Sequence, residues 1–188
     1  PPAGHTNERV DRDGGISVEL YDGTVLWLFG DSLERDAAGN DLYFVHNSAA
    51  LAASSEPAVT RDAVVGGAPV EFVTPSAQHA AAMGCPPDRP VSGLWPMSAS
   101  AGARTGSTQR VIAFFANMCM GGPGEFEDRG VAVVEWTYRV GSTQPGSVLT
   151  GTVIEDFLFD VDSPEWGSAS WTRSESGHDM VYGYDCGS

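Results

Sequence analysis

The sequence DGGISVELYDGTVLWLFGDS, from Asp13 to Ser32, contains two short runs of alternating residues that favour β-strands. The runs, Ile16 to Leu20 and Val25 to Phe29, flank an Asp-Gly pair, and this pattern predicts a tight β-hairpin. Because a hairpin returns the chain to its starting point, residues just outside its open ends become neighbours. We therefore expect Asp13 and Asp31, 18 positions apart (31 − 13), to lie side by side at one rim of a sheet.

Two carboxyl groups at a strand rim are the groups that acid and base catalysis on a sugar requires. Glycines stand next to both acids, at Gly14, Gly15 and Gly30, and they leave room for a ligand to approach. The same pattern also occurs in an ordinary solvated loop. The pattern alone leaves both interpretations open.

The composition favours a single β-rich domain that acts on an uncharged ligand. The chain has 188 residues, of which 41% are hydrophobic, and its 23 Gly and 12 Pro suit a fold with many turns. All ten basic residues are arginine and the net charge is −15, so the chain repels phosphate backbones and anionic membranes. We expect a neutral glycan rather than nucleic acid. No apolar run reaches the length of a membrane span, so no membrane insertion is expected.

The three cysteines and four histidines match no zinc-binding spacing, and no metal or cofactor is expected. Cys85 lies in a loop before one predicted strand and Cys119 at the end of the next, so both reach the same rim. This placement predicts a disulfide between them, with Cys186 paired beyond the present terminus or left free. A disulfide favours an exported protein, either secreted or in the cell envelope.

Further strands and one helical turn are expected along the rest of the chain. Residues 33–42 predict a polar loop, Tyr43 to Ala53 a strand, and Val70 to Val73 another strand. A helical turn is expected from Ala77 to Met83, within a long loop. The remaining predicted strands are Leu94 to Ala99, Arg110 to Met118, Gly130 to Val140, Thr152 to Phe159 and Met180 to Tyr184.

One pattern occurs three times: a segment rich in small residues leads, across a polar turn, to an aromatic strand that ends in a polar residue. It divides the chain into three units, at about residues 13–75, 91–160 and 163–188, the last incomplete. Three aromatic strands end alike, in LFGD at Asp31, FFAN at Asn117 and YGYD at Asp185. The three units begin with similar segments, DGGIS, LWPMS and EWGSA. Their first residues, Asp13, Leu94 and Glu165, therefore hold corresponding positions in the units. A radial array of four-stranded sheets explains this rhythm, so we predict an all-β fold of the β-propeller type. Acidic residues from different blades would meet at the mouth of its central channel.

The stretch DGGISVELYDGTVLWLFGDS followed by HNSAALA resembles the first blade of the five-bladed β-propeller glycosidases, especially bacterial endo-D-arabinanases, over about residues 10–52. The resemblance implies a glycoside hydrolase that cleaves a furanose-rich polysaccharide such as arabinan. It maps Asp13 and Asp31 onto the acidic pair of the first blade and Glu165 onto a general acid. A five-bladed propeller needs roughly twice this length. The resemblance therefore implies about two and a half blades here, completed by a companion segment or chain.

Five further residues are candidate substrate ligands. Trp95 and Trp166, at the starts of the second and third units, are expected to stack on sugar rings, and Asn47 and Asn117 to hydrogen-bond hydroxyl groups. Asp185 is the fifth candidate. The alternatives are buried tryptophans, asparagines that satisfy the backbone, and acids that merely occupy a rim or turn. For the whole protein, the alternative is a non-catalytic glycan-binding or structural propeller.

Overall fold

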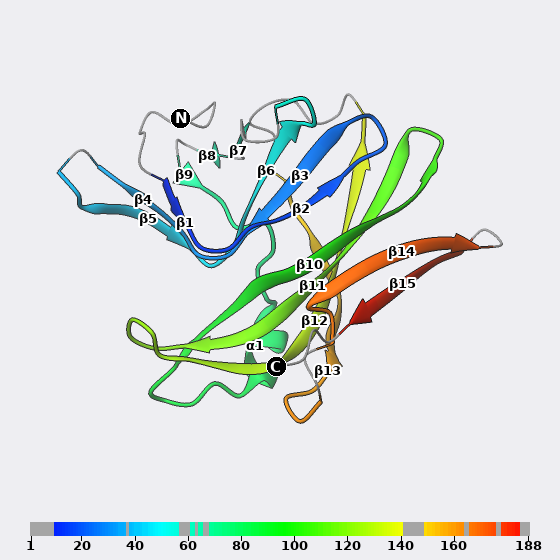
Figure 1. Cartoon of the computed structure of the whole chain (residues 1–188). Coiled ribbons are helices and arrows are strands. Elements are labelled where there is room, and N and C mark those ends of the chain that lie inside the picture. Colours follow the sequence, from blue (N-terminus) through cyan, green and yellow to red (C-terminus); the bar gives the residue numbers. More distant parts are fainter. Residues whose placement is uncertain are drawn as a thin grey trace.

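The computed structural model describes residues 10–36, 38–56, 61–62, 64–65, 68–140, 149–163, 166–175 and 178–184. Within these ranges it contains fifteen strands and one short helix, so the prediction of an all-β protein is confirmed (Figure 1). The strands form several sheets, and none of those built from the described residues closes on itself. The propeller arrangement and its three units stay a prediction.

The predicted hairpin forms the centre of the first sheet. β2 (Ile16–Glu19) and β3 (Thr24–Phe29) pair antiparallel, and the turn between them uses Gly23 at a φ of 82°, which favours glycine. Asp22 Oδ1 accepts a hydrogen bond from Thr24 N at 3.0 Å and closes the turn. With β6 (Ser48–Ala53) and β7 (Arg61–Asp62), the hairpin makes a four-stranded sheet of order β2-β3-β6-β7.

The same hairpin continues past this sheet into a three-stranded arm. The arm consists of β1 (Val10–Arg12), β4 (Ser32–Arg35) and β5 (Asp41–Val45), in the order β1-β4-β5. The predicted loop over residues 33–42 is therefore wrong at its start, because Leu33 pairs with Asp11 on one side and Phe44 on the other. The arm projects from the rest of the molecule (Figure 1).

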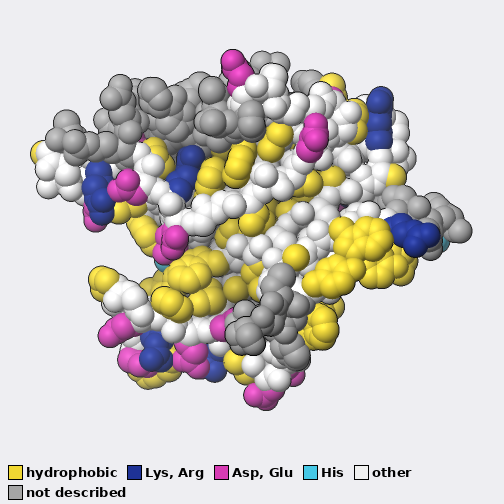
Figure 2. Space-filling model, viewed as in Figure 1, with side chains coloured by type: hydrophobic (Ala, Val, Ile, Leu, Met, Phe, Trp, Pro, Cys, Tyr) yellow, Lys and Arg dark blue, Asp and Glu magenta, His cyan; other side chains and the backbone are white. Residues whose placement is uncertain are grey.

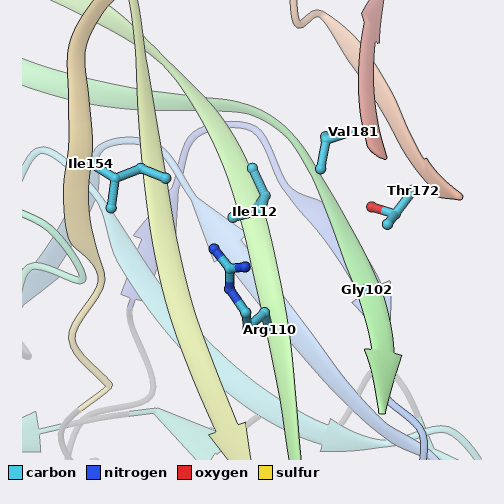
Figure 3. Close-up of a pocket in the computed structure, with 6 residues that line it drawn as sticks. All are labelled: Gly102, Arg110, Ile112, Ile154, Thr172 and Val181. Atoms are coloured by element: carbon cyan, nitrogen blue, oxygen red, sulfur yellow. The ribbon is translucent and has the colours of Figure 1, made fainter. Parts of the chain in front are cut away.

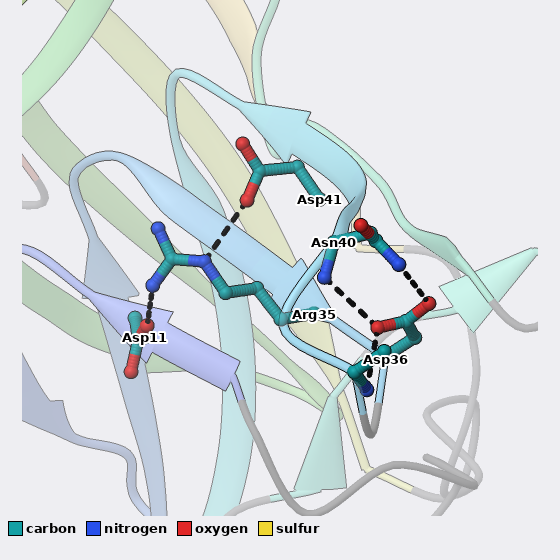
Figure 4. A network of polar contacts seen from close by, with 6 residues as sticks. Asp11, Arg35, Asp36, Asn40 and Asp41 are labelled. Carbon is teal, nitrogen blue, oxygen red and sulfur yellow. Dashed lines mark hydrogen bonds and ion pairs between the residues drawn. The ribbon is translucent and has the colours of Figure 1, made fainter.

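Polar contacts fasten the three strands of the arm to one another (Figure 4). Arg35 bridges two carboxylates, at 2.7 Å from Asp11 Oδ2 and 2.9 Å from Asp41 Oδ1. In the turn that follows β4, the side-chain amide and the backbone N–H of Asn40 donate to Asp36 at 2.8 and 2.9 Å. These donors hold the pKa of Asp36 below its ordinary value.

Two further expectations for the first unit are wrong. The predicted strand from Tyr43 to Ala53 is broken at His46 and Asn47, where the chain passes from the arm to the first sheet. Residues 70–73 form no strand, because the backbone of Val73 bonds to the side chain of Asn47 instead of to a neighbouring strand. The fourth strand of the first sheet is β7, and β8 (Val64–Val65) pairs separately with β9 (Ala68–Pro69).

The second sheet is a four-stranded antiparallel meander in which strands follow one another in chain order. It contains β10 (Val91–Thr105), β11 (Thr108–Met120), β12 (Phe126–Arg139) and β13 (Thr152–Phe159). Each lies where the sequence predicts a strand, and β10 to β12 extend further than predicted. Asn117, Cys119 and Phe115 of β11 are completely buried, which explains why these long strands hold together.

Helix α1 (Ala77–Met83) and a disulfide precede this sheet. Ser76 caps the helix by accepting a hydrogen bond from His79 N at 3.1 Å, and Gly84 ends it at a φ of 61°. Cys85 is then bonded to Cys119 of β11, with their Cα atoms 5.3 Å apart. Both the helical turn and the disulfide predicted from the sequence are confirmed.

A third sheet packs on the second. It is a hairpin of β14 (Ala169–Glu175) and β15 (His178–Tyr184). Hydroxyl groups join the two sheets, since Ser100 Oγ lies 2.6 Å from Thr172 Oγ1. Before β14 the chain approaches so closely that a Cβ at Gly167 would lie 2.7 Å from Phe114 Cγ.

The main core lies between the first and second sheets, and a smaller one lies between the second and third. Leu26 and Leu28 of β3 meet Val111 and Phe115 of β11 in the main core, and all four are nearly inaccessible. On the opposite face of the second sheet, Phe114 and its neighbours pack with Val181 of β15. The second sheet is thus the middle layer (Figure 1). None of the helical segments that the structure describes is both long and apolar enough to cross a membrane.

Candidate functional site

Asp13 and Asp31 lie at the corner where the long hairpin bends from the first sheet into the arm. The strands keep one register through the corner, because Ile16 pairs with Leu28 on one side of it and Arg12 with Ser32 on the other. This register sets Asp13 opposite Asp31. Asp13 N donates to Asp31 O at 2.8 Å. The structure therefore brings the two acids together, as the hairpin spacing predicts, while their catalytic role stays a prediction.

Two glycines allow the chain to bend at this corner. Gly14 has a φ of 61°, a left-handed conformation that other residues adopt at a cost. Gly30 N donates to Asp13 O at 2.8 Å, and a Cβ at Gly30 would lie 3.1 Å from that oxygen. A larger residue would strain the backbone at Gly14 and would crowd the backbone of Asp13 at Gly30.

The side chain of Asp31 is held on one of its two oxygens. The indole Nε1 of Trp95, from β10, donates to Asp31 Oδ1 at 3.0 Å. The imidazole Nδ1 of His46 lies 3.6 Å from the same oxygen. No partner of Asp31 Oδ2 or of the exposed Asp13 carboxylate is found among the described residues.

A hollow with an aromatic wall adjoins this corner. Figure 2 shows it between the arm and the end of the second sheet at the β11–β12 turn, with hydrophobic side chains gathered on the side of the second sheet. Trp95, which contacts Asp31 at the corner, packs with Phe126 of β12; the ring centroids are 5.4 Å apart, and Phe126 is 57% exposed. Met97 and Met120 pack beside Trp95. The site thus combines two carboxyl groups with two neighbouring aromatic rings.

Asn47 holds the backbone next to Trp95 in place. Its side chain is buried, and its amide nitrogen donates to Val73 O at 2.8 Å and to Leu94 O at 3.0 Å. Its oxygen accepts from Val73 N at 2.9 Å. These are the contacts of a residue that satisfies the backbone, the alternative that the sequence left open. Since Leu94 precedes Trp95, Asn47 also fixes the strand that carries the indole.

Asn117 belongs to a separate buried cluster next to α1. Its amide nitrogen donates to Asp156 O at 2.9 Å, and its oxygen faces His79 Nε2 at 2.9 Å. The Nδ1 atom of the same imidazole lies 3.3 Å from Asp156 Oδ1. A cavity of about 290 Å³ adjoins Asp156 and is lined by hydroxyl groups, Ser76 among them. This cavity has one carboxyl group where glycoside hydrolysis needs two.

The remaining predicted site residues come from the third unit. Glu165 and Asp185 lie outside the described residues. Trp166 is 39% exposed. Its ring packs against that of Phe159, the last residue of β13, with centroids 6.4 Å apart. The contacts that define the corner therefore come from the first and second units.

Reasoning from the sequence missed two residues near the site and did not choose Asp128 as a site residue. His46 was counted among four scattered histidines, although its place in the HNS segment after an aromatic strand was a usable signal. Phe126 gave no local signal. Asp128, two positions further along β12 and opposite Met118, is half-buried, and this burial raises its pKa although Gly130 N donates to it at 2.6 Å.

A second pocket, of about 240 Å³, lies between the second sheet and the β14–β15 hairpin (Figure 3). Among the described residues that line it, Arg110 is the only charged one, and its guanidinium is paired with Glu135. The pocket therefore has neither a free charge nor a pair of acids. Over the described ranges, no three His, Cys, Asp or Glu side chains gather as ligands for a metal ion. The described residues that line the pocket of Figure 3 are Gly102, Arg110, Ile112, Ile154, Thr172 and Val181.

The chain is similar in fold to part of a known structure. No protein-family model and no curated protein matches the chain. Among solved structures, it is similar to a protein from Bacteroides ovatus described as a "putative hydrolase", with a TM-score of 0.51 and 19% sequence identity. The match covers 92% of this chain and 45% of the other, so this chain spans less than half of that protein. At this identity the likeness concerns the fold alone: the chain shares its arrangement of sheets with part of a longer protein.

Proposed function

We propose that the protein is a glycoside hydrolase that cleaves a furanose-rich polysaccharide such as arabinan. The observation that carries the proposal is the pairing of Asp13 with Asp31 at a glycine-lined corner beside an aromatic hollow. Glycoside hydrolysis needs one carboxylic acid to protonate the leaving oxygen and one carboxylate to attack or to activate water. The description of the similar solved structure as a candidate hydrolase agrees with this class of reaction.

Asp31 is the carboxylate in this proposal. The indole N–H of Trp95 donates to its Oδ1 and fixes the position of the carboxyl group. Oδ2 then attacks the sugar or takes a proton from water. The proton for the leaving oxygen comes from Asp13 or from Glu165, the two remaining acids that the sequence indicates.

The aromatic wall supports a sugar as the substrate. Trp95 and Phe126 offer ring faces against which the apolar face of a sugar can pack, next to the carboxyl groups that would cleave its bond. A net charge of −15 favours a neutral polysaccharide over a phosphorylated or sulfated one. The preference for furanose rings rests on the resemblance of the first unit.

The proposed setting is outside the cytoplasm, in the cell envelope or the surrounding medium, which the Cys85–Cys119 disulfide supports. We also propose that a further segment or chain completes the channel. The outer face of the β14–β15 hairpin carries Trp171, Tyr182 and Tyr184, which are 38% to 45% exposed. A row of exposed rings of this kind is typical of a face that another sheet covers.

The test is cleavage of arabinan by the protein and by matched variants, followed as release of reducing sugar. Asp31→Asn and Asp13→Asn should each fold normally and lose about a hundredfold or more in kcat, the scale for removing a positioned acid or base. Asp11→Asn is the control, because it removes a nearby carboxylate, in β1, that contacts Arg35 instead. Glu165→Gln identifies the general acid if its loss is comparable.

Two results would contradict the proposal. Cleavage at the parent rate by Asp31→Asn would remove this residue from the chemistry. Binding of arabinan without cleavage by the parent protein would favour the non-catalytic glycan-binding module. Binding should persist in both Asn variants, because the amide keeps the size of the carboxylate.

A further inference from the structure

We propose that His46 is a positioning residue for Asp31: with Trp95 it holds Oδ1, so that Oδ2 is the oxygen that reacts. This inference rests on the proposed function for the meaning of that free oxygen. The contact itself rests on the geometry of the corner, where Trp95 Nε1 lies 3.0 Å and His46 Nδ1 3.6 Å from Oδ1.

The imidazole of His46 is held in place from several sides. Its ring lies edge-on to that of Phe44, with centroids 5.0 Å apart. On the side of β10, a Cβ at Gly93 would lie 3.1 Å from both Cβ and Cγ of His46, so the backbone there leaves the ring little space. His46 N donates to Glu71 Oε1 at 3.3 Å. The ring therefore keeps its orientation towards Asp31.

The protonation of Nδ1 follows from its surroundings. This atom is buried and has no hydrogen-bond partner among the described residues, and the carboxylate oxygen of Asp31 lies 3.6 Å away. A bare ring nitrogen and a carboxylate are both acceptors and repel each other, whereas an N–H facing the oxygen attracts it. Nδ1 therefore carries a proton, and a small movement brings it within hydrogen-bond distance of Oδ1.

The charged groups around His46 favour the same arrangement. Asp31 faces its ring, Glu71 contacts its backbone, and Asp13 stands opposite Asp31 across the hairpin corner. From β10 and the arm, the residues that pack against the ring are Gly93 and Phe44, which carry no charge. Of these acids, Asp31 is the one whose carboxylate faces the ring, and an N–H at Nδ1 is the group that it attracts.

The first measurement needs no enzymatic activity. Two-bond ¹⁵N–¹H correlation spectra of the imidazole identify which nitrogen carries a proton. In the parent protein His46 should be protonated on Nδ1, and its signals together with the Trp95 indole N–H signal should move in Asp31→Asn. Asp11→Asn, whose carboxylate contacts Arg35, is the control and should leave both signals in place. A His46 protonated on Nε2 alone would overturn the inference.

The second measurement is kinetic and uses a conservative pair of variants. His46→Leu removes the donor, whereas His46→Asn keeps an amide N–H close to the position of Nδ1. His46→Leu should lower kcat up to about a hundredfold with little change in KM, the effect of a misplaced reacting group, and His46→Asn should recover most of the loss. Equal activity of the Leu variant and the parent would overturn the inference while the proposed function stands. A parent protein that cleaves no glycan would refute the proposed function itself, while the spectra would still report on the contact.

Discussion

Reduction of the Cys85–Cys119 disulfide should destabilise the protein by about 4 kcal/mol. The bond joins residues 34 positions apart and encloses the loop after α1, all of β10 and most of β11. In the chain-entropy model, cross-linking a loop of this length removes about 13 cal/mol/K of entropy from the unfolded chain, or about 4 kcal/mol at 25 °C. Cys119 is completely buried, so the native contacts around it should change little when the bond opens.

The assay is urea unfolding of one and the same chain, with and without a reductant, in a Cys186→Ser background that leaves a single pair of thiols. Comparing two redox states of one sequence avoids the cavity that a Cys119→Ala substitution would create. The control is Cys85→Ala, which should be insensitive to the reductant and close to the reduced parent in stability. A difference below about 1 kcal/mol between the two redox states would refute the loop-closure reasoning.

Three further variants test separate parts of the fold. Asn47→Ala should cost about 2 to 4 kcal/mol in urea unfolding, because it leaves buried backbone groups of Val73 and Leu94 without partners; unchanged stability would favour a role in binding substrate. Burial acts to raise the pKa of Asp22, but donors led by the Tyr138 hydroxyl hold it below its ordinary 3.8. The stability from this ionised group is present above 3.8 and is lost as the pH falls through the lowered pKa. Tyr138→Phe should therefore cost about 1 kcal/mol at neutral pH and less once the pH falls below the lowered pKa of Asp22, and a cost that stays constant throughout an acid titration would contradict the pairing. Gly130→Ala should lower the thermal midpoint, because φ is 104° and a Cβ would lie 2.3 Å from a carbonyl oxygen of β13; an unchanged midpoint would contradict this local geometry.

Local patterns were sufficient to predict much of the framework. Alternation of apolar residues and the Asp22-Gly23 turn predicted the first hairpin, and the hairpin in turn predicted that Asp13 and Asp31 are neighbours. The strands of the second sheet and the Cys85–Cys119 bond also followed from the sequence. These features depend on contacts between adjacent strands, whose period of two residues is visible in the sequence itself.

Where the prediction of local structure went wrong, side chains from elsewhere determined the outcome. The run from Tyr43 to Ala53 has the composition of one strand, yet it splits at His46 and Asn47. Asn47 bonds to the backbone of Val73 and of Leu94, 26 and 47 positions away, and this fixes the point where the chain changes sheet. A run of β-favouring residues carries no information about such distant partners.

The environment of Asp31 was decided by the tertiary structure alone. Trp95 is 64 positions from Asp31 in the sequence, and it reaches Oδ1 only because the second sheet packs against the first with β10 beside the hairpin. His46 meets the same oxygen because the break between β5 and β6 turns its ring towards the corner. The sequence by itself determined which acids are paired. Packing between the sheets decided which of their oxygens is held and which is free, because that depends on the angle and spacing of layers joined by non-local apolar contacts.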